Sequence, residues 1–360
     1  FCLPSRAVRT LRGNLPFISF TTPSGQCQSN SQNLYKQTCF NLPYMLTKAG
    51  LTVIDVLTTG REATVAELST NTEYSKPHLY EVVEQLVADG LLTEQRGPHN
   101  QRQIRVTDHP VVETYRTLQS ELGHVDWPTL LSPATLRVCW FLDEPRRVAD
   151  IAARLDITRQ SVHKGLDPLK DRAMLSPSGP EYALQHDLSP LLAFTRAVVR
   201  HEHRSRARTL APSATVKWCD PRRALVRVQT SDDTTSLLED REWQLTGLGR
   251  FDEYGLQFFL ANEPAFWYGP EEALSAAEVV CHTLALDRGS RRVSYALLLI
   301  EKEGIEHDRL ATIAQWYDLQ PAIKAMYRCL QDEADRPEEP PITLPGDSEF
   351  MALKEQYGVA

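Results

Sequence analysis

The sequence of 360 residues lacks a hydrophobic run long enough to cross a bilayer. Its longest apolar stretches, such as Ala296 to Ile300, fall far short of the ~20 residues that a membrane-spanning helix needs. The seven cysteines form no Cys-x-x-Cys pair, no histidines follow them at zinc-ligand spacing, and their number is odd. This pattern argues against a disulfide framework and a structural zinc. It predicts a protein of the reducing cytoplasm with no cofactor and no membrane partner.

The motifs of common catalytic sites are also missing. There is no glycine-rich phosphate loop, no Gly-x-Ser-x-Gly and no His-Glu-x-x-His. Asp220 with Glu301 and Lys302 has the residue types of a nuclease acid–acid–lysine set, but charges beside apolar segments are more common as solvated ends of elements. His282, next to Cys281 in an apolar segment, is expected in the core. We therefore predict that the protein is not an enzyme.

Lysine is scarce, with 9 Lys against 30 Arg. Arginine makes bidentate contacts with phosphates and bases better than lysine does, but an Arg-rich genome produces the same excess. The net charge of −8 argues against a nucleic-acid-binding chain taken as a whole. The charge is uneven, however: residues 45–125 carry 7 basic and 11 acidic residues, residues 126–210 carry 13 and 10, and residues 211–360 carry 15 and 26. A basic surface is therefore expected in the middle segment. The acidic excess elsewhere suits a high-salt cytoplasm, which would screen phosphate attraction.

Acidic residues are absent from residues 1–44, which hold four basic side chains and three cysteines. Neither a helical nor a strand period is sustained there. Such a stretch is typical of a targeting peptide or of a cationic arm for nucleic acid. Because helical periodicity begins at Met45, we expect the native chain to start there and residues 1–44 to be a disordered or non-native upstream extension.

Residues 45–125 have the pattern of three helices followed by a two-stranded hairpin. Apolar side chains at helical spacing give each long helix one buried face, and a polar, basic tip separates the two strand candidates. The expected elements are a helix ending at Gly60, a short helix capped by Thr64 and Glu67, a helix from Ser75 to a left-handed cap at Gly90, strands at 91–95 and 103–107, and a linker helix from Val111 to Leu122.

Residues 126–210 repeat this order and add a basic helix. The expected elements are a helix from Pro133 to Leu142, a helix from Arg147 to Ile157, a third helix from Arg159 to Leu169 capped by Thr158, a hairpin from Leu175 to Leu184, and an apolar helix from Leu188 to Val199 that continues into the arginine run Arg196 to Arg208. Gly165 and Pro168 lie inside the third helix, where an interior Pro costs about 3 kcal/mol, so that helix is expected to be short or kinked. The arginine run suits either a phosphate backbone or the acidic C-terminal half, and the sequence does not choose between them.

The repeated order resembles the winged helix-turn-helix regulators of the ArsR and MarR type, in an archaeal-looking tandem arrangement. The clearest phrase is V-A-D-I-A-A-R-L-D-I-T at residues 148–158. The resemblance implies that the exposed N-terminal face of each third helix enters the major groove of double-stranded DNA, while hairpin arginines lie on phosphates. The predicted DNA-contacting residues are Ser75, Lys76, His78, Tyr80 and Glu81 in the first module, Arg159, Gln160, Ser161, His163 and Lys164 in the second, and Arg96, Arg102 and Arg105 on the first hairpin. The alternative is that these exposed faces are only solvated.

Residues 211–335 predict an α/β domain for an effector or a protein partner. The expected elements are strands at Ala224–Thr230, Gln257–Leu260 and Ala265–Tyr268, a loop at Ser231–Thr235, and helices at Tyr295–Leu310, Leu310–Trp316 and Pro321–Leu330. Val279–Leu284 fits a strand, but the Ser-x-x-Glu before it equally caps a helix. Residues 336–360 read as a linker and a short helix at Phe350–Tyr357. The aromatic residues Phe258, Phe259, Phe266, Trp267 and Tyr268 are expected in the core rather than on a partner surface.

The phrase from Trp243 to Leu256 resembles the C-terminal domain of abortive-infection-type antitoxins. Those proteins pair a winged helix with a domain that neutralises a nucleotidyltransferase toxin, and they repress their own operon. This chain departs from that pattern in having two winged helices and an added tail from Pro337.

We therefore predict a mixed α+β fold: two consecutive winged helix-turn-helix modules, an α/β domain and C-terminal helices. The predicted function is a cytoplasmic, sequence-specific, DNA-binding transcriptional regulator. The alternative is an antitoxin of a type IV-like pair that binds its toxin through residues 211–335. A homodimer would match a palindromic site, although no heptad seam requires one.

Overall fold

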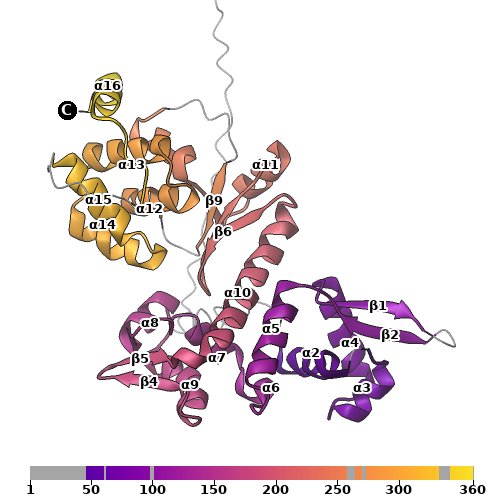
Figure 1. The fold of residues 1–360 in the computed structure, drawn as a ribbon. Coiled ribbons are helices and arrows are strands. Elements are labelled where there is room, and N and C mark those ends of the chain that lie inside the picture. Colours follow the sequence, from indigo (N-terminus) through magenta and orange to yellow (C-terminus); the bar gives the residue numbers. More distant parts are fainter. Residues whose placement is uncertain are drawn as a thin grey trace, which may run out of the picture. The chain divides into compact units, whose positions relative to one another are not determined.

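The structure, a computed structural model, describes residues 46–60, 62–97, 101–257, 264–269, 273–331 and 341–359. Helices and small antiparallel sheets give the mixed fold that the sequence predicts (Figure 1). None of the helices in these ranges is long and apolar enough to cross a membrane. The expectations for residues 1–44, for Phe258 and Phe259 and the rest of their strand, and for the linker before residue 341 lie outside the described residues.

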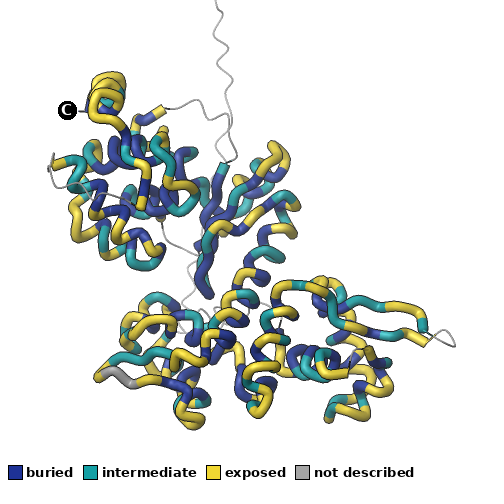
Figure 2. Tube along the Cα trace, in the orientation of Figure 1, coloured by how far each residue is buried: buried dark blue, intermediate teal, exposed yellow. Residues whose placement is uncertain are grey.

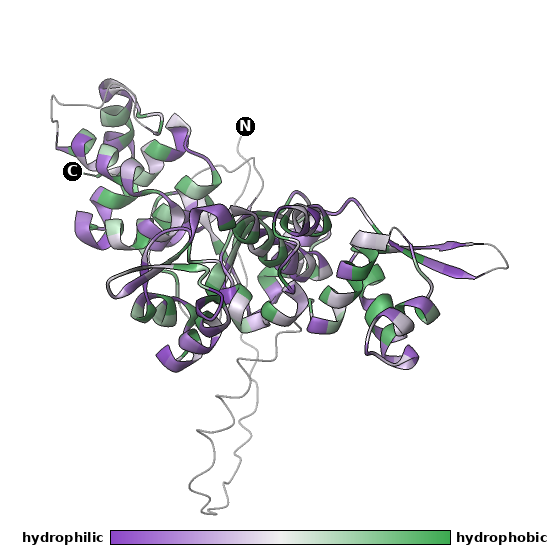
Figure 3. Cartoon of the chain, turned by 60° about the horizontal axis from the view of Figure 1, so that its bottom comes forward, coloured by the Kyte–Doolittle hydropathy of each residue, from purple (hydrophilic) through white to green (hydrophobic). Residues whose placement is uncertain are grey.

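The first described elements follow the predicted order. They are α2 (Lys48–Gly60), α3 (Val65–Asn71), α4 (Lys76–Ala88), β1 (Leu92–Arg96), β2 (Arg102–Val106) and α5 (Pro110–Glu121). Two predicted caps are confirmed: Thr64 and Glu67 form the capping box of α3, and Gly90 follows α4 with a φ of +73°. Strands β1 and β2 are antiparallel, and this hairpin is mostly hydrophilic (Figure 3).

The second set of elements also follows the predicted order. It comprises α6 (Trp127–Leu130), α7 (Pro133–Cys139), β3 (Arg146–Arg147), α8 (Val148–Leu155), α9 (Arg159–Lys170), β4 (Leu175–Ser178), β5 (Glu181–Leu184) and the 3-10 helix η2 (His186–Leu188). The three strands form a small antiparallel sheet in the order β3-β5-β4. Helix α9 packs against α7 and α8. From α7 on, the main elements are three helices and then the β4–β5 hairpin, the same order as in the first set.

One hydrophobic core runs through both sets of elements, and Figure 2 shows its buried segments in dark blue. It includes fully buried Tyr115 on α5, buried Trp127 on α6, and Phe194 on α10 (Ser189–Leu210). The rings of Tyr115 and Phe194 lie 5.2 Å apart, where α5 packs along α10. The predicted boundary at residue 125 therefore does not separate two hydrophobic cores.

The C-terminal half is built on a four-stranded antiparallel sheet in the order β6-β7-β9-β8. Its strands are β6 (Thr215–Cys219), β7 (Ala224–Arg227), β8 (Trp243–Thr246) and β9 (Ala265–Tyr268). The predicted strands at β7 and β9 are confirmed, and Phe266, Trp267 and Tyr268 are buried as predicted. Side chains alternate along β9: Phe266 joins the core shared with α10, whereas Trp267 joins the core of the C-terminal helices.

Helices lie between the strands of this sheet in the chain and follow its last strand. They are α11 (Ser231–Glu239), η3 (Gly247–Tyr254), α12 (Ala276–Leu286), α13 (Ser290–Lys302), α14 (His307–Ala314), η4 (Gln315–Tyr317), α15 (Gln320–Leu330) and α16 (Asp347–Tyr357). The last contains the predicted terminal helix. Cys139, Cys219 and Cys281 are buried free thiols.

Three local predictions need correction or a choice. The loop predicted at Ser231–Thr235 is the start of α11, because Thr230 caps the Asp233 N–H and two aspartates in the first turn favour a helix N-terminus. The segment Val279–Leu284 is helical, since Ser275 and Glu278 form the capping box of α12. The single helix predicted from Tyr295 to Leu310 is divided into α13 and α14 at Gly304, where φ is +58°.

Candidate nucleic-acid interface

Helix α9 is positioned from its N-terminus by the cap that the sequence predicts. The Thr158 hydroxyl accepts a hydrogen bond from the Ser161 N–H at 3.1 Å, and the hydroxyls of Thr158 and Ser161 lie 2.9 Å apart. Before this cap, Asp156 adopts the left-handed region with a φ of +53°, which ends α8 and turns the chain. Val162, Leu166 and Leu169 then face the core. The opposite face of α9 is thereby fixed toward solvent.

Of the two expectations for α9, short or kinked, the first is wrong, because the helix runs for 12 residues through both Gly165 and Pro168. Gly165 is buried against α7, where an added Cβ would lie 2.9 Å from the Ala134 carbonyl oxygen and 2.8 Å from Val138 Cγ2. The glycine therefore permits the two helices to approach closely. Gly165, which the sequence suggested to be a defect in the helix, is therefore the residue that allows α9 to pack closely on α7.

The exposed side chains on the first two turns of α9 are hydrogen-bond donors, and most of them are basic. Arg159, Gln160, His163 and Lys164 are exposed, and Ser161, used by the cap, is half-buried. Arg159, Gln160 and Lys164 form no ion pair or side-chain hydrogen bond with the described part of the chain. His163 Nδ1 lies 3.4 Å from Lys170 Nζ. This face carries no carboxylate before Asp167.

The hairpin that follows α9 differs from the first hairpin in charge. Residues 173–185 contain no arginine or lysine, and Glu181 on β5 pairs with Arg147 at 3.2 Å. A basic contribution from this set of elements must therefore come from α9 and its flanks, not from the β4–β5 hairpin.

Helix α4 places all five predicted residues, Ser75, Lys76, His78, Tyr80 and Glu81, on its exposed N-terminal part, with Tyr80 45% exposed. The same exposed surface carries the carboxylates of Glu81 and Glu84. His78 Nδ1 lies 3.9 Å from Glu81 Oε2, so one predicted contact residue is partly engaged by another. The face of α4 is therefore less suited to a polyanion than the face of α9.

The β1–β2 hairpin holds the remaining predicted residues. Arg96, Arg102 and Arg105 are all exposed. Arg102 Nε donates to Glu94 Oε2 across the two strands at 2.6 Å, which neutralises part of its charge. Arg105 stands opposite Thr93 in the strand register and has no acidic cross-strand neighbour there. The hairpin thus retains cationic side chains beside α4 that could lie along a phosphate backbone.

The arginine run on α10 is largely engaged by the protein itself. Partial burial of Arg204, followed by the nearby charges of Arg208 and Arg200, lowers its pKa. The other four arginines contact Asp143 at 2.6 Å (Arg196), the Val216 carbonyl oxygen at 3.4 Å (Arg200), the Tyr268 ring at 4.5 Å (Arg206) and the Ala214 carbonyl oxygen at 3.5 Å (Arg208). Three of these four arginines contact carbonyl oxygens or an aromatic ring. None of the four contacts is with an acidic side chain of the C-terminal half.

The suggested nuclease set is not assembled, since each member has a different partner. Asp220 is buried and pairs with Arg154 at 2.8 Å, Glu301 pairs with Lys354 on α16 at 3.0 Å, and Lys302 donates to the Gly255 carbonyl oxygen. In the described ranges no group of three or more His, Cys, Asp or Glu residues has the arrangement of a metal site.

A buried polar network in the C-terminal half was not foreseen. His282 is fully buried, as predicted for a core residue, but its Nδ1 lies 2.8 Å from Thr246 Oγ1 and its Nε2 lies 2.9 Å from the Tyr317 hydroxyl. Its ring stacks on Trp267 with 4.1 Å between centroids. Burial, followed by the nearby Arg154 and Arg250, lowers the pKa of His282 to about 3. The imidazole is therefore neutral, with one ring nitrogen donating and the other accepting.

Residues 240–359 match a family model described as HVO_2833_C, C-terminal. The match covers a third of the chain and contains the His282 network but none of the predicted DNA-contacting residues. No curated protein and no solved structure matches the chain. Residues 240–359 are thus a segment with relatives of their own. They lie apart in the sequence from the first and second sets of elements, residues 48–121 and 127–188, which we call the two helix–hairpin sets.

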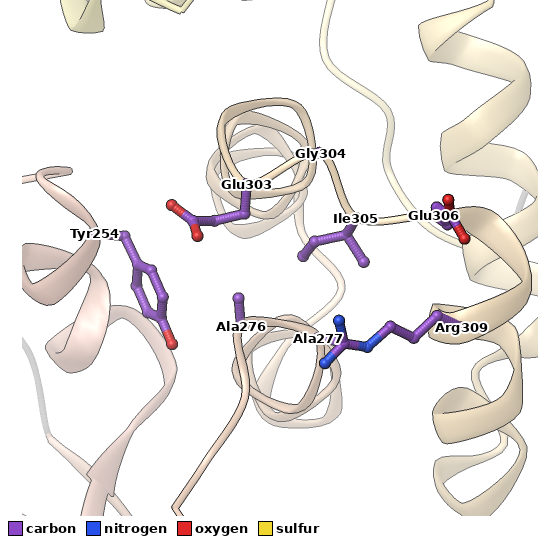
Figure 4. Close-up of a pocket in the computed structure, with 8 residues that line it drawn as sticks. All are labelled: Tyr254, Ala276, Ala277, Glu303, Gly304, Ile305, Glu306 and Arg309. Atoms are coloured by element: carbon purple, nitrogen blue, oxygen red, sulfur yellow. The ribbon is translucent and has the colours of Figure 1, made fainter.

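The matched region also contains an open pocket of about 510 Å³ (Figure 4). It lies where the start of α12, the end of α13 and the start of α14 meet, and Tyr254 reaches it from η3. Its lining residues are Tyr254, Ala276, Ala277, Glu303, Gly304, Ile305, Glu306 and Arg309. Its charged groups, Glu303, Glu306 and Arg309, are exposed and of both signs.

Proposed function

We propose that this protein is a sequence-specific regulator of transcription that binds double-stranded DNA through tandem winged-helix modules, with α9 as the reading helix. By reading helix we mean the helix whose side chains contact base edges. The observation that carries the proposal is the exposed face of Arg159, Gln160, His163 and Lys164 on the first two turns of α9. Arginine and lysine donate to the O6 and N7 of guanine, and glutamine pairs with adenine.

The contrast between the two modules supports α9 over α4. A helix in the major groove lies between two rows of phosphates, so carboxylates on its exposed face oppose binding. Glu81 and Glu84 stand on the exposed surface of α4, whereas the first acidic residue of α9 is Asp167 in its third turn. Arg96, Arg102 and Arg105 then have the role of phosphate contacts that fix register and carry no sequence information.

The experiment is a mobility-shift titration with DNA upstream of the protein's own gene and with genomic fragments, at several salt concentrations. We compare the wild type with the double variant Arg159→Ala/Lys164→Ala and, as control, with Lys76→Ala on α4. Each base contact is worth about 1–3 kcal/mol, so the double variant should bind at least about 30-fold more weakly. Lys76→Ala should lower affinity only slightly. Equal affinity of the wild type and the double variant, or no shift by the wild type, would refute the proposal.

A second candidate function is an antitoxin that sequesters a nucleotidyltransferase toxin. The separate family match of residues 240–359, together with the excess of 11 acidic residues in 211–360, favours a partner-binding role for the C-terminal half. The two functions are compatible, because an autoregulating antitoxin also binds an operator. Co-purification of the chain with the product of an adjacent nucleotidyltransferase gene would support it; an isolated gene with no co-purifying partner would count against it.

A further inference from the structure

Arg154 lies on α8, but its side chain contacts residues of the C-terminal half. Its Nε lies 2.8 Å from Asp220 Oδ2, and the two side chains are only 13% and 2% exposed. The guanidinium lies over the rings of Trp316, Trp218 and Tyr317, at 5.1, 5.6 and 5.9 Å from their centroids. Burial opposes its charge, but Asp220 and Tyr317 together outweigh burial, and the pKa of Arg154 is raised. A permanent cation is thus held between aromatic rings and a buried carboxylate.

The carboxylate partner is itself held rigidly in the turn between β6 and β7. Asp220 Oδ1 accepts the backbone N–H groups of Arg222 at 2.8 Å and Arg223 at 2.7 Å. The Asp220 carbonyl oxygen lies 2.8 Å from Nε2 of buried His203 on α10. Because these bonds fix both the backbone and the carboxylate of Asp220, Arg154 pairs with a preorganised negative charge.

The same β6–β7 turn also holds the turn between α8 and α9. Arg223 Nη1 donates to the Arg154 carbonyl oxygen at 2.8 Å, which satisfies one of the carbonyls left open at the end of α8. Arg222 pairs with Asp156 at 2.9 Å, and Asp156 is the left-handed residue that ends α8. Three contacts from one turn of the C-terminal half therefore converge on the residues just before α9.

Trp316 on η4 completes this set of contacts. It is half-buried and packs against the core of the two helix–hairpin sets as well as against the core of the C-terminal helices. Besides Arg154 it lies under Arg146, at 5.2 Å, and meets the Phe141 ring edge to face. It belongs to the segment with its own relatives, residues 240–359.

We propose that Arg154, Asp220 and Trp316 are positioning residues for α9, through which the C-terminal half sets the orientation of the reading helix. A buried ion pair stabilises a fold poorly compared with apolar side chains of the same volume, whereas it does specify one geometry. The placement of this pair at the α8–α9 turn matches that use. A ligand or protein that displaces η4 therefore changes DNA affinity. This inference rests on the proposed function for its consequence, but the contacts exist without DNA.

The test compares Trp316→Ala and Arg154→Lys with the wild type, with Trp316→Phe as the conservative variant and Tyr295→Ala as control. Tyr295 is another half-buried aromatic residue stacked by an arginine, but it lies on α13 within the C-terminal half. Arg154→Lys keeps the charge and loses the planar fork, so it tests the geometry if Trp316→Ala folds poorly.

Two readouts separate positioning from general stability. Without DNA, amide hydrogen exchange of residues 156–164 should become at least fivefold faster in Trp316→Ala and Arg154→Lys, with α13 unchanged, and Trp316→Phe should restore it. With DNA, affinity for the preferred sequence should fall about tenfold while affinity for random duplexes stays the same. Unchanged exchange at 156–164, or an equal change everywhere or in Tyr295→Ala, would overturn the proposal. If the wild type binds no DNA, the proposed function fails, and the exchange result still decides the positioning role.

Discussion

Three buried histidines are the residues whose ionisation links this fold most directly to pH. Burial lowers the pKa of His201 and His203 on α10 to about 4 and that of His282 on α12 to about 3. His109 and Arg204 add to the effect at His201, and Arg206 adds to it at His203. Each imidazole is therefore neutral in the folded protein at pH 7, while the unfolded chain takes up a proton below about pH 6.5.

This difference predicts acid sensitivity with a defined sign. The stability is complete above about pH 6.5 and falls as the pH decreases toward 4, because protons bind the unfolded state first. Each histidine contributes about 1.4 kcal/mol per pH unit, so at pH 5 the loss is about 2 kcal/mol for each. Urea denaturation between pH 5 and 8 measures it. A free energy of unfolding that does not fall between pH 7 and 5 would contradict this assignment.

His201 allows a sharper version of the same measurement. Both of its ring nitrogens are buried without a hydrogen-bond partner in the described part of the chain, next to the His109 ring at 4.3 Å. Replacement by leucine removes an unsatisfied polar group, so His201→Leu should be neutral or stabilising at pH 8 and should have a shallower pH slope. A large loss of stability at pH 8 would show that the imidazole has a partner after all.

For single residues, the sequence predicts helix caps well and the hydrogen bonds of buried polar side chains poorly. Thr64, Thr158 and Gly90 could be assigned because a cap is a local pattern within four residues. His282 was correctly placed in the core, but its bonds to Thr246 and Tyr317 join positions 36 and 35 residues away and leave no mark in the local pattern.

Among the elements, the close packing of α9 on α7 gives the clearest prediction. A Cβ at Gly165 would meet the Ala134 carbonyl oxygen at 2.9 Å, so Gly165→Ala must push the helices apart despite the better helix propensity of alanine. We expect a loss of about 1–3 kcal/mol in the free energy of unfolding, as for other overpacked cores.

The matched control is Gly60→Ala at the end of α2, where an added Cβ would meet nothing within 4 Å. That change should be neutral or stabilising by up to about 1 kcal/mol. Urea denaturation of both variants gives the comparison. Equal stability of the two variants would mean that α7 and α9 are not in contact at this glycine.

Most elements of the first two sets were predicted, although α6, β3 and η2 were not, and those of the C-terminal half were predicted only in part. Helices with one apolar face and glycine or threonine at their ends carry their own boundaries in the sequence. The sheet does not, because β9 pairs with β7 and β8 across long separations, and its insertion between them cannot be derived from any one segment. At Gly165 the local rule predicted a defect, while the packing required the glycine.

For the whole molecule, the distribution of charge matters more than its sum. The net charge of −8 suggests a poor partner for DNA, yet the exposed start of α9 is free of acid and the carboxylates gather on α4 and in the C-terminal half. The chain-level count could not show this, because it does not distinguish exposed arginines from those of α10 that contact carbonyl oxygens and a ring. The sequence names the candidate residues on both helices, and their contact with DNA stays a prediction; the preference for α9 over α4 required the exposed neighbours of those residues.

The most direct test of the central claim is selection from a pool of random DNA duplexes by the full chain, followed by sequencing. We expect the wild type to enrich one recurring sequence at a salt concentration where random duplexes are released. The triple variant Arg159→Ala/Gln160→Ala/Lys164→Ala should enrich no sequence, although it folds as the wild type does. A wild-type pool no different from the starting pool, or the same sequence enriched by the triple variant, would contradict α9 as a reading helix.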